Sequence, residues 1–225
     1  MAPERDNGTS KTPGSGTESV TPSVTYTRTG DKGATTLGDG SRTSKDDLRI
    51  VAYGETEEAS AAIGLAISLS ELPDPVVVLL SRVQNDLLDL GADLCVPDDA
   101  EAGPSALRIN DSYLGRLERA CDHFNADLPA LSSFVIPGGT ATSALLHHAR
   151  TVVRRAERAV AQSHRELGES VNPLLIAYLN RVSSLLFILA RGANAEHGDT
   201  LWQPGLTTTC AGYELWETPA EASEL

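Results

Sequence analysis

Four arginines lie close together in the segment HHARTVVRRAERAV, although the chain as a whole is strongly acidic. On a helix, where successive residues are separated by about 100°, Arg150, Arg154 and Arg158 share one face, and Glu157 lies beside them. A solvated charged surface is the commoner explanation for such a run. Repeating one sign at four-residue spacing is nevertheless unfavourable unless an anion or a buried carboxylate lies opposite. The spacing therefore favours a site for a polyanion.

A second candidate site is the segment TRTGDKGATT at 27–36. Its glycines, Gly30 and Gly33, allow the backbone to bend so that N–H groups converge. Lys32 and Arg28 add positive charge, and hydroxyl donors come from Thr27, Thr29, Thr35 and Thr36. Such a loop can cradle phosphates. The residue order of a Walker A motif is absent, however, and taken alone such a segment is more often an ordinary flexible loop.

Composition narrows the classes of partner. The chain has 225 residues, with 18 Lys and Arg against 31 Asp and Glu, which gives a net charge of −13. Because such a surface repels duplex DNA and anionic membranes, we expect neither as a partner. Three cysteines, Cys95, Cys121 and Cys210, form no C-x-x-C pair, which argues against a disulfide framework and favours a reducing cytosol. No signal peptide or membrane span is expected, since the most apolar stretch, 174–190, is interrupted by polar residues.

The candidate residues must be positioned by helices, because helical periodicity dominates the chain after a loop-like segment that begins near Val24. Five helices with short connections are predicted. The first is expected to run from a capping box at Ser44 and Asp47 to Leu72, and the second over about 76–95. The third is expected within 111–128, with Asp111 as its N-cap, and the last two over about 140–167 and about 172–192. No alternating strand pattern appears. The predicted fold class is therefore all-α, an up-and-down five-helix bundle with an extended N-terminal loop segment.

The predicted domain organisation has three parts. Residues 1–23 are rich in Gly, Pro, Ser and Thr and are expected to form a disordered tail. Residues 24–205 would form the helical-bundle domain. Residues 206–225, which end in the acidic run AEASEL, are expected to form a mobile C-terminal tail.

Several motifs resemble, in the same order, those of the PduO-type ATP:cob(I)alamin adenosyltransferases. They are YTRTGDKG at 26–33, TTLGDGSRTSKDD at 35–47, AYGETEE and AAIG within 52–64, QNDLLDLGADL at 84–94, FVIPGGT at 134–140, HHARTVVRRAER at 147–158 and YLNRVSSLLF at 178–187. The resemblance spans roughly residues 25–205. It implies a homotrimer of helical bundles that binds ATP and cobalamin near subunit interfaces, transfers the 5′-deoxyadenosyl group to cobalt and releases triphosphate.

The resemblance also implies which residues contact ATP. They are Thr27, Arg28, Thr29, Gly30, Thr35, Thr36, Lys45, Arg154, Arg155, Glu157, Arg158 and Asn180. Because cob(I)alamin is itself a strong nucleophile, the protein mainly has to orient ATP and stabilise a highly charged leaving group. Arginines, a lysine and Mg²⁺ held mainly by the ATP phosphates suit this task, and Arg154 is expected to be catalytic. Alone, Lys45 would more often be an exposed lysine and Asn180 a satisfied interhelical amide.

Three further catalytic residues are implied by the resemblance. Phe134 would lie against the lower face of the corrin and exclude the lower axial ligand, leaving four-coordinate Co(II) that is easier to reduce. Without the adjacent IPGG motif, a core phenylalanine would be the preferred explanation. Arg150 would pair across the subunit interface with Glu57, which stands where the family has an aspartate. The family's L-S-D motif reads Val182-Ser183-Ser184 here, so a carboxylate is lost.

The sequence thus predicts a cytoplasmic adenosyltransferase that completes the active coenzyme form of vitamin B12. A flavoprotein reductase and an adenosylcobalamin-dependent enzyme are its expected protein partners. One alternative is a non-catalytic trimer that binds ATP or adenosylcobalamin and delivers or senses it; another is a polyanion-binding bundle without a corrinoid. No protein-held metal is assigned, and His147, His148 and His197 are expected to be surface or packing histidines.

Overall fold

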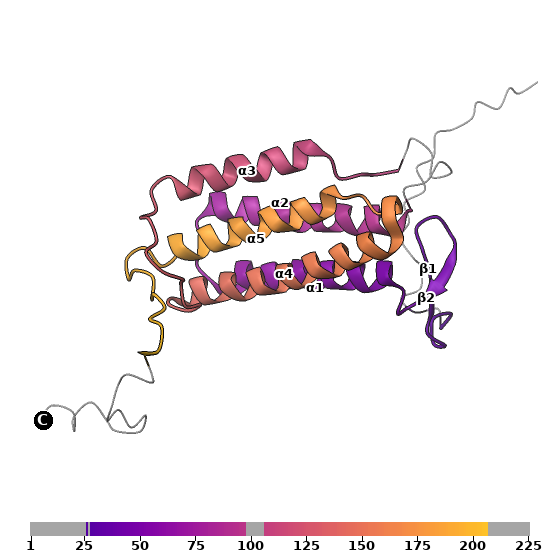
Figure 1. Cartoon of the computed structure of the whole chain (residues 1–225), viewed down its shortest axis with the longest axis horizontal. Helices are drawn as coiled ribbons and strands as arrows, with labels where there is room; N and C mark the ends of the chain where they lie inside the picture. Colours follow the sequence, from indigo (N-terminus) through magenta and orange to yellow (C-terminus); the bar gives the residue numbers. More distant parts are fainter. Residues whose placement is uncertain (1–25, 27, 98–105, 207–225) are drawn as a thin grey trace, which may run out of the picture.

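The computed structural model describes residues 26, 28–97 and 106–206, in which five long helices lie alongside one another (Figure 1). The helices are α1 (Leu48–Leu69), α2 (Asp74–Cys95), α3 (Asp111–Asn125), α4 (Ala141–Leu167) and α5 (Leu174–Gly192), and the 3-10 turn η1 (Gly168–Ser170) joins the last two. The predicted all-α bundle is confirmed. Thr27, the predicted tail at 1–23 and residues 207–225 of the predicted C-terminal tail lie outside the described residues.

The helix ends differ slightly from the sequence prediction. The capping box predicted Ser44 as the N-cap of α1, but Asp47 occupies that position and accepts a hydrogen bond from a backbone N–H. The helix ends at Leu69 rather than Leu72. Asp111 was predicted to cap α3, whereas Asn110 does so by accepting a hydrogen bond from a backbone N–H. Both side chains suit the cap, and Asp111 instead occupies the first turn, where its charge complements the helix dipole.

The N-terminal segment that was predicted to be an extended loop contains a small antiparallel hairpin of β1 (Ala34–Thr36) and β2 (Arg42–Ser44). Gly38, in the turn between the strands, donates its N–H to the carbonyl oxygen of Cys95 at 2.9 Å. A Cβ atom at Gly38 would lie only 2.9 Å from Val96 Cγ2, so the turn approaches the end of α2 closely. The hairpin is thereby held against one end of the bundle.

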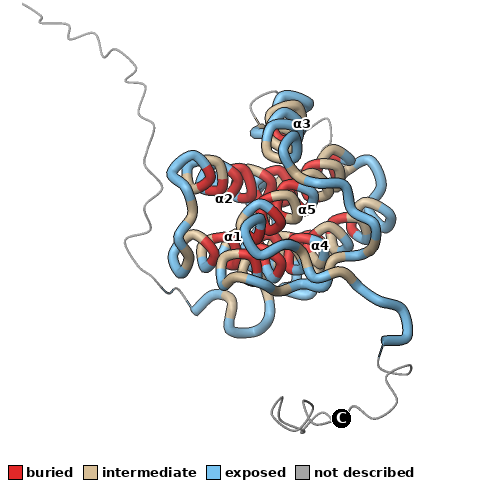
Figure 2. The backbone as a smooth tube through the Cα atoms, turned by 90° about the vertical axis from the view of Figure 1, so that its left-hand side faces the viewer, coloured by how far each residue is buried: buried red, intermediate tan, exposed pale blue. Residues whose placement is uncertain are grey.

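The core lies between the helices, where the buried residues, red in Figure 2, face one another. Helix α4 packs most extensively against α5 and α1, and α3 packs on α5. Helix α5 has the length and apolar composition of a membrane-crossing helix, but 56% of its most apolar window is buried inside the bundle. A central core helix accounts for that composition, because α5 packs against both α4 and α3.

Candidate functional site

The loop before β1 and the β1–β2 hairpin enclose a polar cavity of about 440 Å³. Its lining residues are Arg28, Thr29, Gly30, Asp31, Ala34, Thr35, Thr36, Arg42 and Lys45. Three cations and one carboxylate therefore surround it, which favours an anionic occupant. The cavity brings together every loop residue predicted to contact ATP except Thr27, which is not among the described residues.

The loop turns tightly enough to place a lysine against its backbone. Gly33 adopts a φ of 80° and donates its N–H to the Gly30 carbonyl oxygen at 3.1 Å. A Cβ atom at Gly30 would lie 3.2 Å from Lys45 Nζ, so the absence of a side chain at Gly30 allows the ammonium group to approach the loop backbone closely. The lysine charge is thereby added to the backbone dipoles of the loop.

Sequence reasoning missed one cation of this cavity, Arg42. The antiparallel register places it opposite Thr36, which lies at the other end of the same turn. The Gly-Asp-Gly turn within TTLGDGSR was the available signal, because a hairpin centred there pairs these two positions.

Arg154 and Arg158 lie one turn apart on the exposed side of α4. Arg158 Nη1 donates to the Arg154 carbonyl oxygen at 3.1 Å, and neither guanidinium has a carboxylate partner within the described part of the chain. Glu157 turns toward α5, where it accepts a hydrogen bond from Asn180 Nδ2 at 3.1 Å. Two like charges thus remain open to an external polyanion.

Arg155 points to a different neighbour, α1. Its Nε donates to Glu55 Oε2 at 2.6 Å, and it forms a second ion pair with Glu58. These hydrogen bonds raise the pKa of Arg155 above its usual value. The structure therefore separates Arg155 from the Arg154 and Arg158 face, and its contact with ATP stays a prediction.

Arg150 lies half-buried between α4 and α5, beside a cavity of about 330 Å³. The cavity is lined by Arg150, Arg154, Ser183, Ser184, Phe187 and Ile188. The Arg150 guanidinium carbon lies 5.9 Å from the Phe187 ring centre, and the buried Nε of Arg150 has no hydrogen-bond partner among the described residues. Burial, followed by the charge of Arg154, lowers the pKa of Arg150. Among the described residues, no carboxylate forms an ion pair with Arg150.

Glu57, the predicted partner of Arg150, is exposed on α1, and the described residues show no ion pair between the two. Ser184, which stands where the resemblance expects a carboxylate, is exposed and lines the Arg150 cavity. Within one chain, therefore, Glu57 forms no ion pair with Arg150, and Ser184 has no carboxylate that could do so. The predicted pairing across a subunit interface stays a prediction.

His147 lies one turn before Arg150 and is only 2% exposed. Its ring centre is 6.0 Å from that of Phe187, and its Nδ1 has no hydrogen-bond partner within the described part of the chain. Burial, followed by the charge of Arg150, lowers the pKa of His147. His148 and His197 are exposed. His147 is thus packed as a neutral ring behind the Arg150 cavity.

Phe134 is 78% exposed and belongs to a structure that we call the clasp, residues 129–140 together with 191–202. An antiparallel bridge joins Val135 to Leu201, and the Trp202 N–H donates to the Phe134 carbonyl oxygen at 2.7 Å. The rings of Phe134 and Trp202 lie 6.0 Å apart. Exposure rules out the alternative that Phe134 is a core residue. Sequence reasoning did not assign a role to Trp202.

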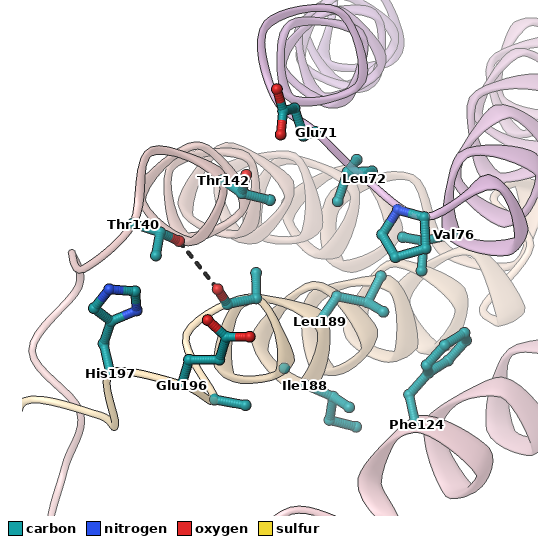
Figure 3. A pocket seen from close by; sticks show the side chains of 14 residues that line it. Glu71, Leu72, Val76, Phe124, Thr140, Thr142, Ile188, Leu189, Glu196 and His197 are labelled. Carbon is teal, nitrogen blue, oxygen red and sulfur yellow. Dashed lines mark hydrogen bonds between the residues drawn. The ribbon is translucent and has the colours of Figure 1, made fainter.

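Another cavity, about 650 Å³, is lined partly by residues of the clasp, among them Thr140 and His197 (Figure 3). One wall contains the hydrogen bond from Thr140 Oγ1 to the Ala193 carbonyl oxygen at 3.1 Å. Apolar side chains such as Leu72, Val76 and Phe124 form much of the remainder. None of the predicted site residues lines this cavity.

The hairpin and the clasp lie at opposite ends of the molecule (Figure 1). Helix α4, which runs between these ends, has 27 residues. At 1.5 Å per residue it is about 40 Å long. A single chain therefore cannot bring the polar loop cavity next to Phe134.

Comparisons with known proteins agree with the motifs. A model of the cobalamin adenosyltransferase family matches residues 25–193. A corrinoid adenosyltransferase of Mycobacterium tuberculosis is 53% identical over 180 residues, which cover 80% of this chain and 93% of that protein. One of Bacillus subtilis is 38% identical over 176 residues, which cover 77% and 88%.

Solved structures show the same relation. A variant of a PduO-type ATP:corrinoid adenosyltransferase from Lactobacillus reuteri, complexed with cobalamin and ATP, aligns with a TM-score of 0.74 at 34% identity. The alignment covers 80% of this chain and 97% of that chain.

Proposed function

Because the chain belongs to the cobalamin adenosyltransferase family, we propose that it transfers the 5′-deoxyadenosyl group of ATP to cob(I)alamin, forming adenosylcobalamin and triphosphate. The observation that carries this function in the molecule itself is the pair of exposed guanidinium groups, Arg154 and Arg158, which have no carboxylate partner in the described structure. Arg154 also lines the Arg150 cavity, and both arginines belong to the helix face that the motifs had indicated for a polyanion.

The chemistry of the transfer explains why cations are needed. The cobalt electron pair attacks C5′ of ATP, the cobalt–carbon bond forms, and the C5′–oxygen bond breaks with its electrons leaving on triphosphate. Guanidinium groups and amides stabilise the charge that develops on that leaving group. Mg²⁺ would bind mainly the phosphate oxygens of ATP, since Mg²⁺ commonly reaches its site through substrate phosphates.

The active assembly is proposed to be a homotrimer, with each site shared between subunits. The length of α4 supports this arrangement, because it separates the loop cavity from Phe134 within one chain. To act together with Phe134, the loop cavity would therefore have to come from a neighbouring subunit. Glu57 of one subunit would then neutralise Arg150 of the next. The mass of the assembly in solution tests the proposal, and a monomer that retains full activity would contradict it.

Phe134 is proposed to lie against the lower face of the corrin, where a phenyl ring offers cobalt no ligand. Since Co(II) must gain an electron before it can attack ATP, we expect a flavoprotein reductase as electron donor and an adenosylcobalamin-dependent enzyme as recipient. A cytoplasmic location is proposed as well. The free thiols of Cys95 and Cys121 support a reducing compartment.

Replacing Arg154 with alanine tests the function. We expect Arg154→Ala to abolish ATP-dependent adenosylation while the bundle still folds, because the exposed side chain has no role in the core. The assay mixes protein, ATP, Mg²⁺ and chemically reduced cobalamin, and follows the absorbance change to adenosylcobalamin. Arg165→Ala is the matched control, since Arg165 is an exposed arginine near the end of the same helix.

The same assay separates the proposed enzyme from its alternatives. Normal turnover in Arg154→Ala would refute the role of that residue. A wild-type protein that perturbs the cobalamin spectrum without turnover would be a delivery or sensor protein. One that causes neither change would bind some other polyanion.

A further inference from the structure

The clasp presents two aromatic rings on one face of a short antiparallel ladder. The bridge between Val135 and Leu201 places Phe134 directly opposite Trp202, because their positions are each displaced by one residue in opposite directions. Side chains alternate between the two faces of such a ladder. Phe134, Ile136 and Trp202 are accordingly exposed, whereas Val135 and Leu201 are partly buried.

The two rings touch although both are accessible to water. Trp202 is 47% exposed, and its ring makes an angle of 57° with that of Phe134. Cross-strand aromatic pairs stabilise each other in this geometry. Exposed apolar residues gathered on one segment indicate a binding surface rather than a core.

Buried polar side chains fix the backbone that carries these rings. Arg191, which is 6% exposed, donates to the carbonyl oxygen of Pro129 at 2.6 Å and pairs with Asp199 at 2.8 Å. Asn194 accepts a hydrogen bond from the Thr140 N–H at 3.2 Å. A Cβ atom at Gly139 would enter the Asn194 side chain, so the two halves of the clasp are closely fitted. The backbone beneath Trp202 is therefore fixed relative to that of Phe134.

We propose that Trp202 is a positioning residue for Phe134. Its indole ring limits the rotamers of the phenyl ring and keeps that ring presented to the lower face of the corrin. An exposed phenylalanine without such a neighbour would lose more side-chain entropy on meeting the substrate. The inference rests on the proposed function, because it concerns how Phe134 excludes the lower axial ligand.

The test compares Trp202→Ala, Trp202→Phe and the wild-type full chain, each with cob(II)alamin and ATP. The readout is the ratio of four-coordinate to five-coordinate Co(II), measured by electron paramagnetic resonance. We expect Trp202→Ala to lower this ratio about fivefold, which corresponds to about 1 kcal/mol for one lost ring contact. Trp202→Phe should retain most of it, and the affinity for ATP should be unchanged in both variants.

Leu131→Ala is the matched control, because it removes another exposed apolar side chain of the clasp that has no ring contact with Phe134. An unchanged Co(II) ratio in Trp202→Ala overturns the proposal. So does an equal loss in Leu131→Ala, which would assign the effect to the apolar surface in general, and so does a loss in Trp202→Phe as large as in Trp202→Ala. If the wild-type protein forms no four-coordinate Co(II), the role proposed for Phe134 fails instead.

Discussion

At the hairpin end, Arg28, Arg42 and Lys45 stand exposed around a polar cavity, whereas at the clasp end Phe134 and Trp202 rest on backbone held by buried polar side chains. The contrast follows from what each end is proposed to bind. Charge acts over several ångströms and tolerates small displacements, so a short hairpin suffices for phosphate. Exclusion of an axial ligand depends on contact, which requires a fixed ring.

Substitutions at the two ends should therefore affect different measurements. Changes at the hairpin should weaken ATP binding and leave the coordination of cobalt intact once ATP is saturating. Changes at the clasp should alter the coordination of cobalt and leave the affinity for ATP intact. A variant that moves both measurements equally would remove the distinction.

The largest of these effects is expected for Phe134→Ala. Loss of the ring forfeits about 1.5–3 kcal/mol of apolar contact, which corresponds to about a ten- to hundredfold lower yield of four-coordinate Co(II). The yield is measured from the spectrum of cob(II)alamin bound with ATP, and ATP affinity is measured by calorimetry. A larger effect on ATP affinity than on the cobalt spectrum would contradict the assignment of Phe134 to the corrin.

A smaller effect is expected at the other end, for Lys45→Ala. The ammonium group lies against the loop backbone at Gly30, and its loss would remove the charge-assisted contact that we propose it makes with phosphate. We expect about tenfold weaker ATP binding, since contacts with charged groups contribute about 1.5 kcal/mol or more, and an unchanged Co(II) ratio at saturating ATP.

Lys32→Ala is the control for Lys45, because Lys32 is an exposed lysine of the same loop that does not line the cavity. If both variants weaken ATP binding equally, the loop attracts ATP by its net charge alone. That result would deny Lys45 a specific contact and weaken the assignment of the hairpin cavity to phosphate.

The helices could be predicted because their apolar periodicity extends over many residues. Apolar spacing over the 27 residues of α4 averages out individual exceptions, and the predicted end at Leu167 agrees with the structure. The strands β1 and β2 have three residues each, too few for alternation to be visible, so the hairpin and Arg42 were missed.

The sequence predicted which residues belong to the candidate site better than it predicted which residues they contact. The repeat of Arg154 and Arg158 follows from helical geometry alone. The ion pairs of Arg155 with α1 depend on how two helices pack, which no local pattern encodes. Trp202 was missed for the same reason, because its pairing with Phe134 joins segments that are distant in the sequence.

The smallest expected effect is on the pH dependence of folding stability, and it arises from a difference in burial between the two ends. The cations of the hairpin cavity are exposed, whereas His147 is buried near the clasp end, where Asp199 only partly offsets the burial and the charge of Arg150 that lower its pKa. The unfolded chain therefore binds a proton near pH 6.5 that the folded chain resists. Stability should fall as the pH drops below that value, by at most about 1.4 kcal/mol per pH unit for this group. Denaturant unfolding should show a shallower decline for His147→Gln than for the exposed control His148→Gln, and identical pH profiles would mean that His147 does not resist protonation.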